Sequence, residues 1–166
     1  GVQEVWISSR SAASAEALAT QVRALGAQVR VVADADAALA HCPLVAVCTT
    51  ASSLVLHATP RPDAFITAVG AFSPAMAELA PALCVHVAPH GSIVVDTADA
   101  SHEAGDLLQA GLDVAALPVL RDVVCGPWTP RAPTGPVLFK SCGWAGWDLA
   151  AARLALRQGA AQRPAT

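Results

Sequence analysis

Charged residues are scarce in this sequence. Of its 166 residues, 14% are charged and 54% are hydrophobic, whereas about 25% are charged in an average globular domain. Much of the surface must therefore contact protein rather than water, either in a sheet buried on both faces or against another domain. Because the net charge is −3 and lysines and arginines do not cluster, we expect no nucleic-acid partner.

Long hydrophobic runs and targeting signals are also absent. Proline, glycine or a charged residue interrupts each hydrophobic run before it could cross a bilayer, so no membrane contact is expected. The first residues, GVQEVWISSR, lack a basic segment followed by an apolar run, which a secretory signal requires. The cysteines form no C-x-x-C pair, and we expect free, mostly buried thiols in a cytoplasmic protein. They are Cys42, Cys48, Cys84, Cys125 and Cys142.

The common signatures of hydrolases and metal sites are missing as well. No G-x-S-x-G surrounds Ser92 or Ser141, so a serine hydrolase is not expected. His86 and His90 have Pro89 between them and no acidic residue nearby, and no metal site is predicted. Cys142, beside Gly143, is either a reactive thiol at the start of a helix or, as we expect, a small residue packed where backbone segments come close.

What the sequence does contain is an alternation of strand and helix patterns. Short apolar runs that predict strands occupy residues 4–8, 29–32, 44–48, 64–69, 93–96 and 137–140. Ser11 and Asp34 can cap the helices that follow the first two strands, and further helical patterns occupy residues 96–108 and 144–158. The alternation predicts an α/β fold with a Rossmann-type, doubly wound, mostly parallel sheet and helices on both faces.

Residues 64–79, AFITAVGAFSPAMAEL, are the stretch most suggestive of a binding site. The predicted strand ends at Gly70, Ser73-Pro74 makes a turn, and Met76 and Leu79 resume at helical spacing. Ligands of open α/β sheets bind at the carboxyl ends of the strands. Residues 70–74 are therefore expected to line the site.

A dinucleotide site fits this fold, although the G-x-G-x-x-G fingerprint does not occur in the sequence. The first predicted strand ends in Ser8-Ser9-Arg10-Ser11, with no acidic residue to bind an adenosine ribose. Arg10 flanked by hydroxyls would accept a 2′-phosphate, which favours NADP(H) over NAD(H). The alternative is that Arg10 is only a solvated residue after a strand.

Several segments together resemble the ornithine cyclodeaminase/mu-crystallin family. They are VWISSRSAASAEALA (5–19), LVAVCTTASSLVL (44–56), ITAVGAFSPAMAEL (66–79), VVDTADASHEAGDLL (94–108) and VLFKSCGWAGWDLAAARLA (137–155). Their order and spacing are similar to those of the family along almost the whole chain.

The resemblance implies a chain roughly twice as long as this one. Residues 1–143 would be a partial NAD(P)-binding Rossmann-like domain without its first strand and glycine-rich loop. Residues 144–166 would be a helix and tail that pack back toward an N-terminal dimerisation and substrate domain, so a homodimer is expected through a region outside this sequence. Because the first strand is central in the order 3-2-1-4-5-6, strands 4–8 and 44–48 would each expose an edge.

The resemblance also implies a set of cofactor-binding positions, each at or just after the end of a predicted strand. They are Ser9, Arg10 and Ser11 at the adenosine ribose or its phosphate, Thr49 and Thr50 along the dinucleotide, Val69 and Gly70 at the nicotinamide ribose, and Lys140, Ser141 and Gly143 on the nicotinamide side.

Two positions depart from the cyclodeaminase pattern. Phe72 stands where cyclodeaminases have an aspartate, and Met76 stands where they have a lysine. The aspartate is thought to handle a proton at the reacting carbon, which phenylalanine cannot do. No catalytic residue is therefore identified.

The resemblance thus predicts an NAD(P)-dependent oxidoreductase acting on a small imino or amino acid, of the ketimine reductase or amino-acid dehydrogenase type. One alternative is ornithine cyclodeaminase, which converts ornithine to proline and ammonia and recycles NAD. The other is a non-catalytic NADPH-binding protein like the crystallin branch.

Overall fold

The computed structural model describes residues 1–50, 53–132 and 134–161, with side chains as far as residue 158. The strands are β1 (Glu4–Ile7), β2 (Gln28–Val31), β3 (Leu44–Val47), β4 (Phe65–Ala68), β5 (Ser92–Val95) and β6 (Val137–Lys140). The helices are α1 (Ala12–Ala24), α2 (Ala35–His41), α3 (Pro81–His90), α4 (Ala100–Glu103), α5 (Gly105–Gln109), the 3-10 helix η1 (Val114–Ala116), α6 (Leu120–Cys125) and α7 (Ala145–Ala161). The predicted strands are confirmed to within one residue at each end.

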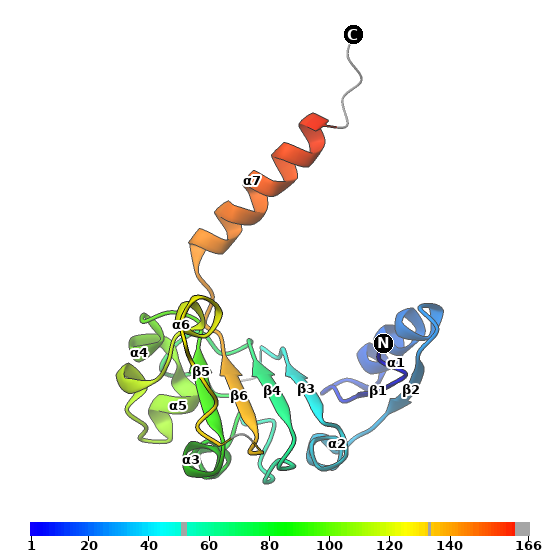
Figure 1. Ribbon diagram of the computed structural model, residues 1–166. Helices are drawn as coiled ribbons and strands as arrows, with labels where there is room; N and C mark the ends of the chain where they lie inside the picture. The colour runs from blue at the N-terminus through cyan, green and yellow to red at the C-terminus, as the bar shows by residue number, and fades with distance from the viewer. Residues whose placement is uncertain (51–52, 133, 162–166) are drawn as a thin grey trace.

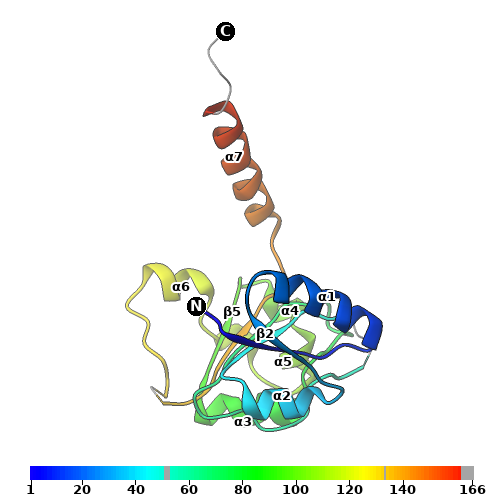
Figure 2. The same cartoon turned by 90° about the vertical axis from the view of Figure 1, so that its right-hand side faces the viewer.

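The strands form two parallel sheets, β1-β2 and β3-β4-β6-β5 (Figure 1). Strands 4, 5 and 6 of the expected order 3-2-1-4-5-6 correspond to β3, β4 and β5. The last strand, β6, for which no place in the sheet was predicted, lies between β4 and β5. The connection from β5 to β6 contains α4, α5, η1 and α6, and it is long enough to lead the chain back between the two earlier strands. Figure 2 shows α1 on one side of the strands and α2 and α3 on the other, as a doubly wound fold requires.

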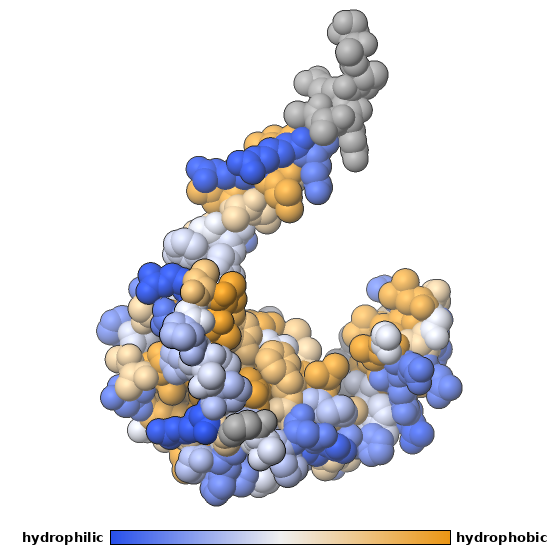
Figure 3. Space-filling model, viewed as in Figure 1, coloured by the Kyte–Doolittle hydropathy of each residue, from blue (hydrophilic) through white to orange (hydrophobic). Residues whose placement is uncertain are grey.

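Among the described residues, β1 and β3 do not pair with each other, and each has one unpaired edge. The predicted position of the missing strand lies between them. Figure 3 shows an open hollow between the unit of α1, β1 and β2 and the four-stranded sheet, with hydrophobic residues on both sides of it. Burial of both faces, expected for the whole sheet, is confirmed for β5 but wrong for β3, where Leu44 is 64% exposed. A strand with an unpaired edge lacks the neighbour whose side chains would cover it.

The caps of the first two helices are confirmed. Ser11 Oγ accepts a hydrogen bond from the Ser14 N–H at the start of α1, and the Asp34 carboxylate accepts one from the Asp36 N–H at the start of α2. Gly26, with φ of +90°, follows the C-cap of α1 in the left-handed conformation that favours glycine. Ala15 and Ala19 of α1 are buried against β1 and β2.

The main core lies in and around the four-stranded sheet. It includes Leu39, Ile66, Leu79, Leu83, Val87, Leu107 and Leu138, each at most 1% exposed. Burying a side chain of this size contributes about 1.5–3 kcal/mol. This core holds the strands whose carboxyl ends form the candidate site.

The predicted helical patterns fail in two places. Residues 74–79 form no helix. The Met76 N–H closes a turn on the Ser73 carbonyl, and Asp106 binds the N–H groups of Glu78 and Leu79 just before Pro81 begins α3. The helix predicted at 96–108 is two short helices that meet at Ala104 and Gly105. A Cβ on Gly105 would overlap the Met76 carbonyl oxygen, so this close approach requires glycine.

Helix α7 projects away from the two sheets (Figures 1 and 2). It begins within a residue of the predicted start, but its apolar stripe is open to solvent, with Leu149, Leu154 and Leu156 52%, 56% and 74% exposed. The division of the chain into residues 1–143 and 144–166 remains a prediction. None of the described helices has the length and hydrophobicity needed to cross a membrane.

Candidate functional site

The carboxyl ends of the four parallel strands lie at one edge of the main sheet. Thr49 follows β3, Gly70 follows β4, Asp96 follows β5 and Ser141 follows β6. These positions come from distant parts of the chain and belong to the edge at which open α/β sheets bind ligands. The sequence predictions at Thr49, Gly70 and Ser141 therefore fall on a common edge.

Buried Glu78 joins two of the loops at this edge. Its carboxylate accepts hydrogen bonds from Thr49 N (2.7 Å), Thr49 Oγ1 (2.7 Å), Gly70 N (2.7 Å) and Ala71 N (3.1 Å). The residue is 1% exposed. Sequence reasoning missed Glu78, although a single acidic residue inside the apolar stretch AMAELAPAL was a signal for it.

Gly70 is required where these two loops meet. A Cβ at this position would overlap the Thr49 carbonyl oxygen and the Glu78 carboxylate. Any larger residue would separate the loops after β3 and β4. The predicted importance of Gly70 therefore has a physical reason in the apoprotein itself.

Lys140 and Asp106 form a buried ion pair behind the same loop. Lys140 Nζ donates to the Ala71 carbonyl oxygen at 2.6 Å and lies 2.8 Å from Asp106 Oδ2, and both side chains are completely buried. The Lys140–Asp106 contact does not have the geometry of a hydrogen bond. Asp106 Oδ1 accepts hydrogen bonds from Glu78 N at 2.6 Å and Leu79 N at 2.8 Å.

This environment bears on the prediction that Lys140 closes the nicotinamide side of the site. The ammonium group points into the protein, toward Ala71 and Asp106. Lys140 can therefore act on a ligand at the edge only through the loop that it holds.

Asp96 fixes the loop after β6. Its Oδ2 atom accepts from Ser141 Oγ (2.9 Å), Cys142 N (2.7 Å) and Gly143 N (2.8 Å). Gly143 has φ of +92°, a conformation that strains any residue with a Cβ. The structure thus brings Ser141 and Gly143 together around a buried carboxylate that sequence reasoning did not single out.

The loop after β4 presents hydrophobic side chains to solvent. Val69 is 43% exposed and Phe72 is 58% exposed, while Met76 is partly buried. The predicted site loop thus carries no acid or base at the two positions where cyclodeaminases have them. A planar ring or an apolar substrate can pack on such a surface.

Ser9, Arg10 and Ser11 lie on the two-stranded sheet, between β1 and α1, and are exposed. Ser9 Oγ accepts from the Ser11 N–H at 3.4 Å, and Ser11 Oγ caps α1, so both oxygens act as acceptors and both hydroxyl hydrogens remain to donate. Arg10 forms no ion pair within the described part of the chain. This donor set fits a phosphate group.

Burial disfavours the thiolate form of the cysteine beside this edge. Burial raises the pKa of Cys142 to about 11, with smaller contributions from neighbouring charges, and burial together with the negative charge of Asp106 raises the pKa of Cys84 to about 12. The packed alternative for Cys142 is thus favoured over a reactive thiolate. All five cysteines are free, but Cys48 and Cys125 are exposed, so the expectation of mostly buried thiols is only partly confirmed.

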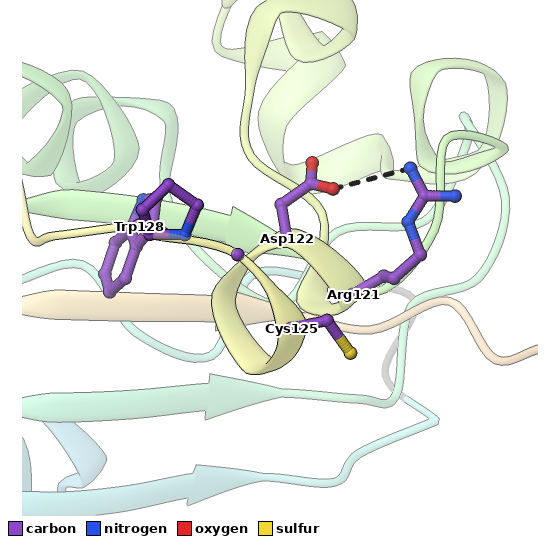
Figure 4. A pocket seen from close by; sticks show the side chains of 6 residues that line it. Arg121, Asp122, Cys125 and Trp128 are labelled. Atoms are coloured by element: carbon purple, nitrogen blue, oxygen red, sulfur yellow. Dashed lines mark hydrogen bonds and ion pairs between the residues drawn. The ribbon is translucent and has the colours of Figure 1, made fainter.

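Two pockets on the surface lie elsewhere. One of about 420 Å³ is lined by residues of α6 and the segment after it, where Figure 4 shows Arg121 hydrogen-bonded to Asp122 near Cys125 and Trp128. Another, of about 500 Å³, lies against His86 and His90, whose rings stack. Neither is lined by a predicted cofactor position.

Comparison with known proteins agrees with the fold. The model of the ornithine cyclodeaminase/mu-crystallin family matches residues 1–161. The chain belongs to the ornithine cyclodeaminase/mu-crystallin family.

Among curated proteins, the chain is 38% identical over 147 residues to Delta(1)-pyrroline-2-carboxylate reductase 1 of Burkholderia multivorans, a match that covers 89% of this chain and 45% of the relative. A solved structure of a probable ornithine cyclodeaminase from Bordetella pertussis is similar with a TM-score of 0.80 and 28% identity, over 99% of this chain and 54% of that one. The Delta(1)-pyrroline-2-carboxylate reductase of Thermococcus litoralis, solved with NADH and L-proline, has a TM-score of 0.80 and 23% identity, over 95% of this chain and 51% of that one.

The chain thus spans about half the length of these members of the ornithine cyclodeaminase/mu-crystallin family. The Thermococcus reductase shares the Rossmann-type fold, and its structure contains bound NADH. The fold class predicted from the sequence is confirmed.

Proposed function

We propose that this chain is the NAD(P)-binding portion of an oxidoreductase that reduces a small cyclic imino acid or oxidises a related amino acid. The observation that carries the proposal is the loop after β4, which offers exposed Val69 and Phe72 and no carboxylate at position 72. Hydride chemistry asks a protein mainly to hold the nicotinamide against the substrate carbon, so an apolar loop suffices. The 38% identity to a named pyrroline-2-carboxylate reductase supports the same substrate class.

In this proposal the residues of this chain hold the cofactor in place and do not themselves react. A bound nicotinamide dinucleotide would supply or accept the hydride. Thr49 and Thr50 would line the dinucleotide, Val69 and Gly70 would lie at the nicotinamide ribose, and Ser141 and Gly143 would border the nicotinamide on the other side. Asp96 keeps the last two at a fixed spacing.

We assign the preference for NADP(H) over NAD(H) to the turn after β1. Arg10 offers a charge and Ser9 and Ser11 offer hydroxyl donors, and the turn has no acid that would repel a 2′-phosphate. A charge-assisted contact of this kind is worth about 1.5–3 kcal/mol.

Ornithine cyclodeaminase is the second candidate because the Bordetella structure at 28% identity bears that name. Phe72 and Met76 count against it, since neither side chain can move a proton. A non-catalytic NADPH-binding protein is the third alternative.

The proposal includes regions that this sequence does not contain. The unpaired edges of β1 and β3 and the exposed stripe of α7 offer surface for a further strand and for a substrate-binding, dimerising domain of the same protein. A homodimer is therefore proposed. The free cysteines support a cytoplasmic location.

The test uses the full-length protein with Δ1-pyrroline-2-carboxylate or Δ1-piperideine-2-carboxylate and NADPH or NADH. We expect loss of absorbance at the reduced nicotinamide band with either imino acid, faster with NADPH. Ammonia released from ornithine without net cofactor change would instead favour the cyclodeaminase. Cofactor binding with neither reaction would favour the non-catalytic protein.

A further inference from the structure

Four residues behind the site loop form a closed circuit of contacts. The Glu78 carboxylate accepts from the Ala71 N–H, the Ala71 carbonyl accepts from Lys140 Nζ, Lys140 pairs with Asp106, and Asp106 accepts from the Glu78 N–H. Both backbone polar groups of Ala71 are therefore bound to buried charged side chains. The direction in which the chain leaves Gly70 and enters Phe72 is fixed from inside the protein.

Only one of the two acidic residues in this circuit has a counterion among the described residues. Asp106 has Lys140 as its counterion, whereas the described cations leave Glu78 with none. Glu78 is surrounded instead by the N–H groups and the hydroxyl of Thr49, Gly70 and Ala71. A buried carboxylate without these donors would be strongly unfavourable, so its charge holds the loops after β3 and β4 together.

Stability alone does not explain such an arrangement. Apolar residues of similar volume often replace buried charged groups with no loss of stability or with a gain. What an apolar side chain at position 78 could not do is bind two loops at once. The loops joined in this way are those that carry Thr49, Val69 and Gly70 of the proposed cofactor edge.

We propose that Glu78 is a positioning residue that sets the spacing between the Thr49 loop and the Gly70–Ala71 loop at which the dinucleotide binds, with the Lys140–Asp106 pair holding Glu78 and Ala71 in place. The proposal rests on the proposed cofactor site. It extends that site by assigning a function to three buried charged residues that do not reach the surface.

The first test is the Glu78→Gln substitution in the full-length protein. The glutamine side chain keeps the size of the glutamate but loses its charge, and the NH₂ group of the new amide would face backbone donors. In the cofactor-free protein, we expect amide hydrogen exchange at residues 49, 70 and 71 to rise at least tenfold. We also expect the Kd for NADPH to rise at least tenfold.

Leu83→Ala is the matched control, because Leu83 is buried in α3 and takes part in none of the hydrogen bonds or the ion pair of the circuit. It should lower the melting temperature while leaving the Kd for NADPH and the exchange at Gly70 and Ala71 unchanged. If Glu78→Gln behaves like this control, the role of Glu78 is only structural and the proposal is wrong.

A milder pair of variants covers the case in which Glu78→Gln does not fold. Thr49→Val removes one of the donors to Glu78 at nearly constant volume, and Thr49→Ser retains the hydroxyl. We expect exchange at Gly70 and Ala71 to rise severalfold in Thr49→Val and to return to the wild-type rate in Thr49→Ser. Equal rates in wild type, Thr49→Val and Thr49→Ser would overturn the proposal.

Failure of the proposed function has a separate signature. If the wild-type protein binds neither NADPH nor NADH, the cofactor site is wrong, and the part of the proposal that concerns binding falls with it. The exchange rates still decide whether Glu78 joins the two loops. Cofactor binding in wild type with no change in Glu78→Gln would overturn only the positioning role.

Discussion

The carboxyl edge of the four-stranded sheet differs from the outlying parts of the chain in how many of its groups find partners within the chain. At the edge, three buried acidic residues and one buried lysine have polar partners from neighbouring loops. In the unit of α1, β1 and β2 and in α7, hydrophobic residues face solvent, and among the described strands β1 and β3 each leave an edge unpaired.

The two regions differ in whether contacts within this chain fix the positions of their loops. The edge loops are fixed by contacts within the chain, so the proposed nicotinamide side of the site would be preorganised. The turn that carries Arg10 belongs to the open unit, so its distance from the edge depends on whatever fills the hollow (Figure 3). The most informative perturbations therefore act on one region and leave the other unchanged.

The largest effect is expected from Lys140→Met, which leaves Asp106 as a buried charge without a counterion. Removing one member of such a pair costs about 3–5 kcal/mol. Urea denaturation of the full-length protein measures the loss, and Arg23→Met, which removes an exposed pair with Glu16, should change stability by less than about 1 kcal/mol. Equal effects of the two substitutions would contradict the buried pair.

Truncation of a leucine in each region gives the next contrast. Leu83→Ala should cost about 2–5 kcal/mol, because Leu83 is 1% exposed in the main core. Leu156→Ala, at a position 74% exposed on α7, should change the stability of this 166-residue chain by no more than about 0.5 kcal/mol. A larger loss in the full-length protein than in the chain alone would show that α7 is covered there.

Arg10→Ala is expected to change cofactor preference and little else. Losing a contact worth about 1.5–3 kcal/mol raises the Kd for NADPH roughly 10–100-fold. The Kd for NADH should stay within about twofold, since it has no 2′-phosphate. Fluorescence titration of both nucleotides measures the two values, and equal changes in both would show that Arg10 does not contact the phosphate.

The smallest effect concerns thiol chemistry. At pH 8, a thiol reagent should modify the exposed Cys48 and Cys125 quickly, and Cys84 and Cys142 slowly, because burial raises the pKa values of the last two to about 12 and about 11. Because these thiols ionise near pH 9 only in the unfolded chain, the stability of the folded state should also fall as the pH rises from 9 toward 11–12. Mass spectrometry of the labelled protein identifies the modified positions, and fast labelling of Cys142 would contradict its burial.

Strand positions could be predicted because buried parallel strands leave short apolar runs in the sequence. The helix expected around Met76 could not be excluded in the same way, since Asp106, 28 residues after Glu78, binds backbone N–H groups that a helix would use. Hydrophobic spacing reports local preference, whereas a distant carboxylate on a backbone N–H group leaves no local pattern. The place of β6 in the sheet could not be predicted for a similar reason, because it depends on a long connection.

The loops of the candidate site could be predicted from the sequence, but the buried charged residues that hold these loops could not. Thr49, Gly70, Ser141 and Gly143 lie at strand ends, and strand ends can be located in the sequence. Asp96 and Asp106 look like ordinary surface acids until the fold shows that each is at most 4% exposed. Only Glu78, 1% exposed, has a signal in the sequence, because it stands alone in an apolar stretch. The burial of Lys140 could not be predicted for a similar reason. A lysine at a strand end suggests a ligand contact, but this side chain is completely buried and donates to the Ala71 carbonyl.

The central claim is that the carboxyl edge of the four-stranded sheet binds the dinucleotide. Amide hydrogen exchange of the full-length protein with and without NADPH tests it most directly. We expect protection at residues 49–50, 69–72 and 141–143, together with the turn at residues 9–11. Protection confined to the cavity at Arg121 and Trp128, or no protection at the strand ends despite bound nucleotide, would contradict it.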